Sequence, residues 1–358
     1  MIMPGSPEFG SREIRIAYIS NVRLNPYVRL LAQGVHAADP GIQPLFISSL
    51  SWLRVLDWRL DLLHLHWAEL QYRSTAEAEA AHRLNGFLRK LSLARRRRLP
   101  IVYTVHNLDQ HEGLHPDLNR RVNHWLFQNA DALHVHHAPL ADQIRPRCKQ
   151  TTRIYVVPHG NYIGAYPNQV GREEARRQLG IAPDRFVYLC LGQIRPYKGI
   201  DELIAAFVQQ ALPDALLLLA GHIGAAGYGD HVRALAAGHP NIRLDPHYIE
   251  DHRLQLYFNA ADVCVLPYRH ATTSGAALLA FSFGRPVIAP NLGPFPELIG
   301  SERGLLFSPA QEGLAQALGE ARKLDLVAAG RRALAYAAAL DWTTLGGQHA
   351  AVYRSLLS

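Results

Sequence analysis

Residues 186–199, Phe-Val-Tyr-Leu-Cys-Leu-Gly-Gln-Ile-Arg-Pro-Tyr-Lys-Gly, decide the fold class. The stretch opens with a continuous apolar run, and an amphipathic segment, Asp201–Gln210, follows almost at once. A short apolar run is typical of a strand buried on both faces, and a helix directly after it is typical of a parallel sheet. This stretch therefore predicts an α/β fold in which helices cover both faces of a parallel sheet.

The same alternation of strand and helix patterns runs along the whole chain. Apolar runs predict strands at 14–20, 42–48, 60–67, 101–106, 132–136 and 154–157, and again at 186–191, 215–220, 242–244, 263–266 and 286–289. A segment rich in Gly, Pro and Asn, Pro158–Arg172, separates the two series. We therefore expect two doubly wound, Rossmann-like domains, 12–160 and 161–340, that face each other across a cleft. Ligands of such sheets bind beyond the carboxyl ends of the strands.

Length and composition exclude several classes of protein. The chain has 358 residues, 48% of them hydrophobic, which is enough for about two domains and excludes a disordered chain. No apolar run approaches the roughly 18 residues of a membrane span, and the N-terminus lacks the layout of a signal peptide. These features predict a cytoplasmic location. The three widely spaced cysteines favour neither a disulfide framework nor a cysteine zinc site.

The positive charge of the chain is concentrated in its first part. Residues 1–160 hold 20 Lys and Arg against 13 Asp and Glu, whereas the remainder holds 17 of each, so the excess of +7 is N-terminal. Much of it lies in Arg89–Arg98, where Leu88, Leu91 and Leu93 would form a basic amphipathic surface. Such a surface would face a phosphorylated partner or an anionic membrane, with attachment to its inner face; the alternative is a solvated helix end. No aromatic-interleaved motif indicates nucleic-acid binding.

The loop after the strand at 186–191 has the composition of a phosphate site. Gly192 opens the loop, and Arg195 and Lys198 would lie at the carboxyl end of the strand beside the start of the next helix. Cationic side chains, free backbone amides and the helix dipole can together bind a diphosphate. The alternative is a surface loop with two solvated cations.

A second loop of this kind follows the strand at 263–266. Thr273, Ser274, Gly275 and Ala276 lead into a helical segment, and their small size lets backbone amides approach an anion closely. Capping of the helix by Thr273 or Ser274 is the alternative.

Four segments carry a resemblance to a known family: Gly192–Gly199 (GQIRPYKG), Ala261–Arg269 (ADVCVLPYR), Ser274–Ile299 (SGAALLAFSFGRPVIAPNLGPFPELI) and Asp341–Leu357 (DWTTLGGQHAAVYRSLL). Together they resemble the C-terminal half of GT-B glycosyltransferases, most closely family 4. The resemblance implies a GT-B fold, donor-diphosphate binding by Arg195 and Lys198, and a terminal segment, 341–358, that crosses back to the N-terminal domain.

The chain also departs from that family pattern. Retaining members carry two glutamates eight positions apart, and Ala271 and Leu279 stand at those positions here. The stretch Thr272–Gly275 is instead similar to the Ser-Gly arrangement of inverting beta-mannosyltransferases of lipid-linked oligosaccharide assembly. Asn21–Pro26 replaces the usual N-terminal glycine-rich loop. The resemblance therefore leaves inversion or retention open and favours inversion.

An inverting transfer needs a general base for the acceptor hydroxyl and positive charge on the leaving diphosphate. The candidate bases follow predicted strands of the first half: Glu69, His106, Asp109, His111 and Glu112. Glu112 is preferred narrowly over Asp109, and the resemblance places His106 beside the donor sugar. Each of these side chains could instead be a helix cap or a core-edge hydrogen-bonding group.

Two further points complete the expected site. His222 and Tyr248 follow strands of the second half and are candidate contacts of the nucleotide base. The pairs His64/His66 and His134/His136 have a chelating spacing on strands, but no carboxylate or cysteine set completes either site. The resemblance implies catalysis without a bound metal ion, and we expect no cofactor.

We therefore expect the chain to transfer a hexose from a UDP- or GDP-linked sugar to a glycan or lipid-linked acceptor in bacterial-type polysaccharide assembly. A sugar-nucleotide epimerase of the same fold and a non-catalytic sugar-nucleotide-binding protein are the alternatives.

Overall fold

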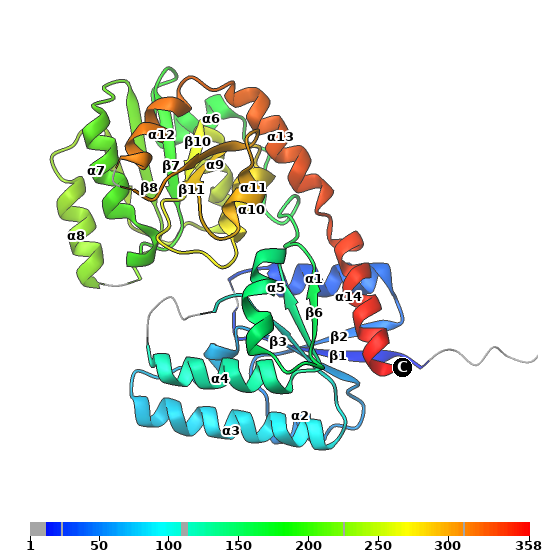
Figure 1. The fold of residues 1–358 in the computed structure, drawn as a ribbon. Coiled ribbons are helices and arrows are strands. Elements are labelled where there is room, and N and C mark those ends of the chain that lie inside the picture. Colours follow the sequence, from blue (N-terminus) through cyan, green and yellow to red (C-terminus); the bar gives the residue numbers. More distant parts are fainter. Residues whose placement is uncertain (1–11, 23, 109–113, 225, 311) are drawn as a thin grey trace, which may run out of the picture. The chain divides into compact units, whose positions relative to one another are not determined.

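The structure is a computed structural model that describes residues 12–22, 24–108, 114–224, 226–310 and 312–358. The chain divides into two compact units, which are described separately (Figure 1). Unit 1 comprises the chain up to Pro158 together with Trp342–Ser358, and unit 2 comprises His159–Asp341. No helix among the described residues is long and apolar enough to cross a membrane.

Unit 1 is built on a six-stranded sheet in which every neighbouring pair is parallel, in the order β2-β1-β3-β4-β5-β6. Its strands are β1 (Ile14–Ile19), β2 (Ile42–Ile47), β3 (Leu62–His66), β4 (Ile101–Thr104), β5 (Ala132–Val135) and β6 (Arg153–Val156). Its helices are α1 (Tyr27–Ala38), α2 (Trp52–Leu56), α3 (Glu77–Arg96), α4 (Pro116–Asn129), α5 (Ala138–Ile144) and α14 (Trp342–Leu357).

The terminal helix α14 belongs to unit 1 because it packs closely on α1. Gly34 and Gly346 make this approach possible, since a side chain at either position would collide with backbone of the other helix. Arg354 and Asp39 form an ion pair at 2.5 Å across the same helix pair. Helices from opposite ends of the sequence thus cover one face of the sheet together.

The other face of the unit 1 sheet is covered in part by α3, and this overturns one expectation. Leu88 and Leu91 are buried in the core of unit 1, and Leu93 packs against that core. The prediction that these leucines form the apolar part of an outer amphipathic surface is therefore wrong. α3 turns this side to the sheet, and the arginines of 89–98 lie on its other sides.

Unit 2 repeats the architecture with the order β12-β11-β10-β7-β8-β9, again parallel throughout. Its strands are β7 (Phe186–Leu191), β8 (Ala215–Ala220), β9 (Ile242–Asp245), β10 (Val263–Val265), β11 (Val287–Pro290) and β12 (Gly304–Phe307). Its helices are α6 (Arg172–Leu179), α7 (Ile200–Gln210), α8 (Ala226–Ala236), α9 (Leu254–Ala260), α10 (Gly275–Ser282), α11 (Phe295–Ile299), α12 (Gly313–Ala321) and α13 (Leu326–Ala339).

The predicted α/β class, with two doubly wound parallel sheets, is confirmed, and the predicted strands agree with the observed ones to within two residues at each end. The strand β12 was not predicted, because it is short, partly exposed and at the edge of its sheet. The predicted linker 158–172 also does more than connect, because His159, Asn161 and Tyr162 are buried. Asn161 donates a side-chain hydrogen bond to Ala337 O of α13 at 2.9 Å.

Candidate functional site

The strand order of unit 2 locates its binding site. From β7 the chain passes to β8 and β9 on one side of the sheet and to β10, β11 and β12 on the other. This change of direction makes the carboxyl ends of β7 and β10 the switch point, where doubly wound sheets bind ligands. The loop that begins at Gly192 and the loop that begins at Leu266 both start there.

Lys198 lies at this switch point, in the 3-10 turn Pro196–Lys198. Its side chain is buried, and its Nζ lies 5.2 Å from the centroid of the Tyr268 ring. A Cβ atom on Gly192 would be only 2.5 Å from this Nζ, so the ammonium group lies directly over the glycine backbone. Within the described ranges no carboxylate is at ion-pair distance from Lys198. A buried cation with so little compensation is suited to an anionic ligand.

Pairing of the loop after β7 with the loop after β8 positions Arg195. The isolated bridge between Ile194 and Ile223 continues the pairing of β7 with β8 beyond the strands themselves. The Arg195 side chain lies against Gly224, where a Cβ atom would be 2.7 Å from its Nε, and its Nε donates to Gln193 Oε1 at 2.8 Å. Gly221 has a φ of +140° and no room for a side chain beside Gly192 O. Glycines therefore give both cations close access to the backbone.

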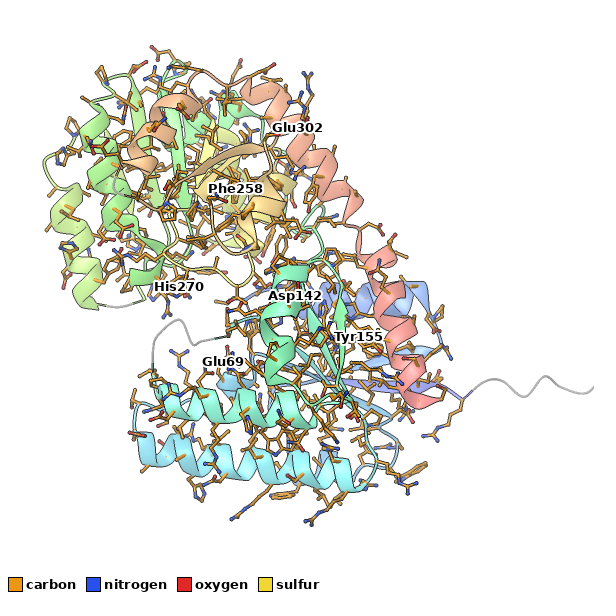
Figure 2. The ribbon with its side chains drawn as sticks, viewed as in Figure 1. Glu69, Asp142, Tyr155, Phe258, His270 and Glu302 are labelled. Atoms are coloured by element: carbon orange, nitrogen blue, oxygen red, sulfur yellow. The ribbon has the colours of Figure 1, made fainter. Side chains whose placement is uncertain are left out.

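The turn that carries Lys198 is braced by the loop after β10. Arg269 donates to Pro196 O at 2.6 Å and pairs with Asp201 at 2.8 Å and Glu202 at 2.9 Å. Its neighbour His270, labelled in Figure 2, lies with its ring 5.6 Å from that of Tyr197. These contacts hold the Lys198 turn against the end of β10.

The start of α7 is not free to bind an anion as the sequence analysis expected. The Tyr228 hydroxyl accepts hydrogen bonds from Ile200 N at 3.1 Å and Asp201 N at 3.3 Å, and donates to Asp201 Oδ1 at 2.7 Å. Tyr228, a residue of α8, thus caps the start of α7. The side chains of Arg195 and Lys198 remain as the groups of this loop that could bind a phosphate.

The start of α10 offers backbone amides instead. Ser274 caps the helix, because its Oγ accepts from Ala277 N at 3.2 Å, which is the alternative that the sequence left open. The amides of Gly275 and Ala276 stand in the first turn, where a helix has no internal acceptors for them. A Cβ atom on Gly275 would lie 3.0 Å from the Tyr162 hydroxyl, so the buried linker residue approaches this helix end. Thr273 precedes the cap and is partly buried.

The two expected base contacts are both exposed. His222 follows β8, and its carbonyl accepts from Ile194 N at 2.8 Å. Tyr248 follows β9 and is 49% exposed, with its hydroxyl 3.4 Å from Asp251 Oδ1. The structure brings His222 to the same loop pair as Arg195, whereas among the described residues Tyr248 makes no contact with the residues around Lys198.

In unit 1 the strand order changes direction between β1 and β3, so the loop after β3 is the corresponding place. Trp67 begins this loop in a left-handed conformation with a φ of +47°. Its ring stacks on that of His106 with centroids 3.8 Å apart and planes 4° from parallel. Tyr27 of α1 contacts the same two rings edge-on. His106 is buried there, with Nε2 3.1 Å from His66 Nδ1.

Glu69 is the acidic residue of this region that the structure describes. It lies in the 3-10 turn Ala68–Gln71 that follows β3 (Figure 2). Burial raises the pKa of Glu69 above its ordinary value, and a hydrogen bond with Asn107 partly opposes the shift. A carboxylate with a raised pKa is better suited to take a proton near neutral pH. The other proposed bases Asp109, His111 and Glu112 lie outside the described residues.

The histidines on β3 and β5, His64, His66 and His134, form a buried row rather than an open polar cluster. His64 and His134 are fully covered, in the layer between the sheet and the helices α1 and α14. His64 is bonded to Tyr353 Oη at 2.7 Å and to Thr104 Oγ1 at 2.8 Å, and Thr104 is bonded to His134 Nδ1 at 3.0 Å. His134 Nε2 donates to Val157 O at 2.8 Å. The two HxH pairs therefore have core roles, which their spacing on strands did not reveal.

This network has one direction of donation. With His134 neutral, its Nε2–H is committed to Val157 O, so its Nδ1 accepts the Thr104 hydroxyl proton. Thr104 then accepts from His64 Nε2, and His64 Nδ1 accepts from Tyr353. Burial lowers the pKa of His64 well below its ordinary value, which keeps this neutral pattern. The described part of the chain contains no group of three His, Cys, Asp or Glu side chains that could hold a metal ion.

Comparison with known proteins identifies the chemistry that fits these sites. Residues 185–323 match the family model described as glycosyl transferases group 1. A GDP-mannose:glycolipid 4-beta-D-mannosyltransferase of Xanthomonas campestris pv. campestris is 29% identical over 282 residues, which are 75% of this chain and 71% of that protein. The chain is a GT-B glycosyltransferase. A D-inositol 3-phosphate glycosyltransferase of Corynebacterium efficiens is also 29% identical, over 230 residues, 58% of this chain and 54% of that protein.

Solved structures support the fold of this glycosyltransferase. The sucrose-phosphate synthase of Thermosynechococcus elongatus superposes with a TM-score of 0.75 at 20% identity, covering 96% of this chain and 99% of the other. An Anabaena protein crystallised with UDP-glucose gives 0.71 at 17% identity, covering 96% and 99%. The expected GT-B fold is thereby confirmed, and the family model together with the named glycosyltransferases confirms the expected hexosyltransferase activity with a nucleotide-sugar donor. The Xanthomonas and Corynebacterium relatives are named as transferases, which supports transfer rather than epimerisation.

Sequence reasoning missed several residues that build the site. Tyr268 and Arg269 stood in a segment quoted for the resemblance, and their position just after a predicted strand was a usable signal. Tyr162 and Tyr228 gave no such signal, because each reaches the site from a segment without a recognisable motif. Trp67 also follows a strand, but only its stacking on His106 marks it.

Proposed function

We propose that this glycosyltransferase transfers a mannosyl group from GDP-mannose to a lipid-linked glycan, with unit 2 binding the donor and unit 1 the acceptor. The observation that carries the donor assignment is the buried Lys198 ammonium at the switch point of unit 2. Among the named relatives, the Xanthomonas protein has both a GDP-mannose donor and a glycolipid acceptor in its name. UDP-linked hexoses are the second donor class.

The proposed reaction is an in-line displacement with inversion. The acceptor oxygen attacks the anomeric carbon, the bond from that carbon to the diphosphate oxygen breaks, and the electron pair leaves with the nucleoside diphosphate. Lys198, Arg195 and the amides of Gly275 and Ala276 stabilise the charge that develops on this leaving group. Because these groups supply the positive charge, no metal ion or other cofactor is required. His106 and Thr273 would contact the donor from their loops, and His222 and Tyr248 would contact its base.

The acceptor proton needs a base, and Glu69 is the described residue best suited to the role. Its raised pKa follows from burial beside the end of β3. Glu112 and Asp109 remain candidates for the same role. A lipid-linked acceptor also implies a position at the inner face of the cytoplasmic membrane, with the cations of Arg89–Arg98 attracted to anionic lipid.

The first experiment is a thermal-shift screen with GDP, UDP, ADP and dTDP. A ligand that binds only the folded protein at about 100 times its Kd stabilises it by about 2.7 kcal/mol, so the preferred nucleotide should stand out. GDP should give the largest shift, and Lys198→Met should abolish it. A larger shift with UDP would redirect the donor assignment, and a shift that survives in the variant would refute the role of Lys198.

The second experiment follows the product. GDP-mannose and a lipid-linked glycan should give a product whose new linkage has the beta configuration, and EDTA should not reduce the rate. Conversion of the donor sugar without an acceptor would instead indicate an epimerase. Donor binding without turnover on any acceptor would indicate a binding protein.

A further inference from the structure

Four large apolar side chains are exposed together on one short segment of unit 1. Trp52 is 47% exposed, Leu53 82%, Leu56 52% and Trp58 75%. Single exposed apolar residues are ordinary on protein surfaces, but a contiguous group of this size marks an interaction site. We call these four residues the α2 patch.

The local structure shows why these side chains face outward. The helix α2 begins at Trp52, after the cap Ser51, whose side chain accepts from Arg54 N at 3.3 Å. Val55 is fully buried in the core of unit 1 and anchors the helix. At about 100° per residue, Trp52, Leu53 and Leu56 fall within an arc of roughly 100°, and the centre of that arc lies about 110° around the helix from Val55. The core of unit 1 therefore does not need the α2 patch.

Cations from the end of α3 and from the residues just after it lie near the α2 patch, because α2 packs beside α3 (Figure 1). The Lys90 ammonium lies 6.0 Å from the Trp52 ring centroid, and the Arg97 guanidinium donates to Val55 O. Residues 51–59 and 89–98 together contain eight Lys and Arg, two plus six, against the single acid Asp57. Asp57 is itself paired with Arg59 at 3.0 Å. The apolar side chains of the α2 patch therefore lie beside a strongly positive part of the surface.

We propose that the α2 patch inserts into the interface of an anionic lipid membrane. Tryptophan and leucine side chains would enter the boundary between headgroups and acyl chains, while the surrounding cations contact lipid phosphates. A second copy of the chain fits this surface poorly, because its own cations would face those of the first. The inference rests on the proposed position at the membrane. It assigns the apolar membrane contact to the α2 patch instead of the leucines of α3, because those leucines are buried.

Binding to vesicles tests the inference with the full chain and no substrate. Vesicles of phosphatidylcholine with phosphatidylglycerol should sediment the protein, and phosphatidylcholine alone should do so much less. The double variant Leu53→Ser, Trp58→Ser should lower the partition coefficient at least ten-fold, because each change removes a large apolar side chain from the interface. Lys90→Gln should lower it about five-fold. Brominated lipids should quench tryptophan fluorescence in the wild type and much less in the double variant.

A matched control uses exposed apolar residues of unit 2. Val327 is 68% exposed and Leu334 40%, so Val327→Ser, Leu334→Ser makes a comparable change away from the α2 patch and should leave vesicle binding intact. Unchanged thermal unfolding would show that each variant is folded.

Three results would overturn the inference. These are absence of vesicle binding, binding that the Leu53→Ser, Trp58→Ser variant retains, and a dimer in sedimentation velocity that this variant dissociates. The nucleotide-induced thermal shift does not involve the α2 patch. It therefore separates failure of this inference from failure of the proposed donor site.

Discussion

Acidification from pH 7.5 to 5.5 should destabilise unit 1 through its buried histidines. Burial lowers the pKa of His64, His66 and His349 well below the ordinary value of 6.5. The unfolded chain therefore binds more protons than the folded chain below pH 6.5. Stability from these groups is fully present above that pH and is lost as the pH falls toward the folded pKa values.

The expected magnitude follows from proton linkage. A histidine that stays neutral in the folded state loses about 1.4 kcal/mol of stabilisation between pH 7.5 and 5.5, so three of them lose about 4 kcal/mol. The raised pKa of Glu69 acts in the opposite direction and offsets part of this loss. Domains are stable by only about 5–15 kcal/mol, so the effect is large. Among the described residues of unit 2, His159 is a comparable group, because burial lowers its pKa to about 4.

Urea denaturation followed by tryptophan fluorescence isolates this effect. All five tryptophans of the chain lie in unit 1: Trp52, Trp58, Trp67, Trp125 and Trp342. The free energy of unfolding reported by fluorescence should fall by several kcal/mol between the two pH values. His349→Gln should reduce that pH dependence by about a third, whatever it does to stability at pH 7.5. A free energy that changes by less than about 1 kcal/mol, with the same slope in the variant, would refute the reasoning.

Three further predictions concern the site. Lys198→Met should lower kcat by about a hundred-fold or more, because it removes a group that stabilises a developing anion. Lys323 is exposed, so Lys323→Met should leave kcat unchanged. Equal kcat values for the two variants would exclude the diphosphate role of Lys198. Glu69→Gln should abolish transfer and keep the nucleotide thermal shift. It should also raise the free energy of unfolding at neutral pH, because a carboxyl group with a raised pKa destabilises the folded state once the pH rises above that pKa. Full activity of the variant would redirect the search to Asp109 or Glu112. Gly221→Ala should cost about 1–3 kcal/mol of stability and weaken nucleotide binding, because Gly221 has a φ of +140° and Gly192 O leaves no room for a Cβ atom. Unchanged melting and nucleotide binding in this variant would contradict the close approach of Gly221 to Gly192.

The elements that the sequence predicted well are those whose signal is local. Strands such as Phe186–Leu191 are buried on both faces, so their apolar runs are continuous and stand out. The family resemblance, rather than a local signal, implied that the terminal segment 341–358 crosses back to the N-terminal domain, and the structure has α14 of unit 1 there. The cationic loop with Arg195 and Lys198 was also predictable, because a site of a parallel sheet begins where a strand ends.

Other features could not be predicted because they depend on what covers a surface. The leucines of α3 have a spacing that suits a membrane face and a core face equally. The short segment Trp52–Leu56 is too brief to show any periodicity, although it holds most of the α2 patch. The HxH spacing places two histidines on one face of a strand without showing whether that face is open.

The sequence by itself therefore determined the class of fold, the order of strands and helices along the chain and the cationic loop after β7, since each depends on residues near one another in the chain. The tertiary structure alone decided which of these groups are buried. His64 meets Tyr353 and Lys198 meets Tyr268 only because parallel strands and the returning helix bring distant segments together. Burial sets the free energy of a charge, and so the chemistry of each site was decided by contacts that no local pattern contains.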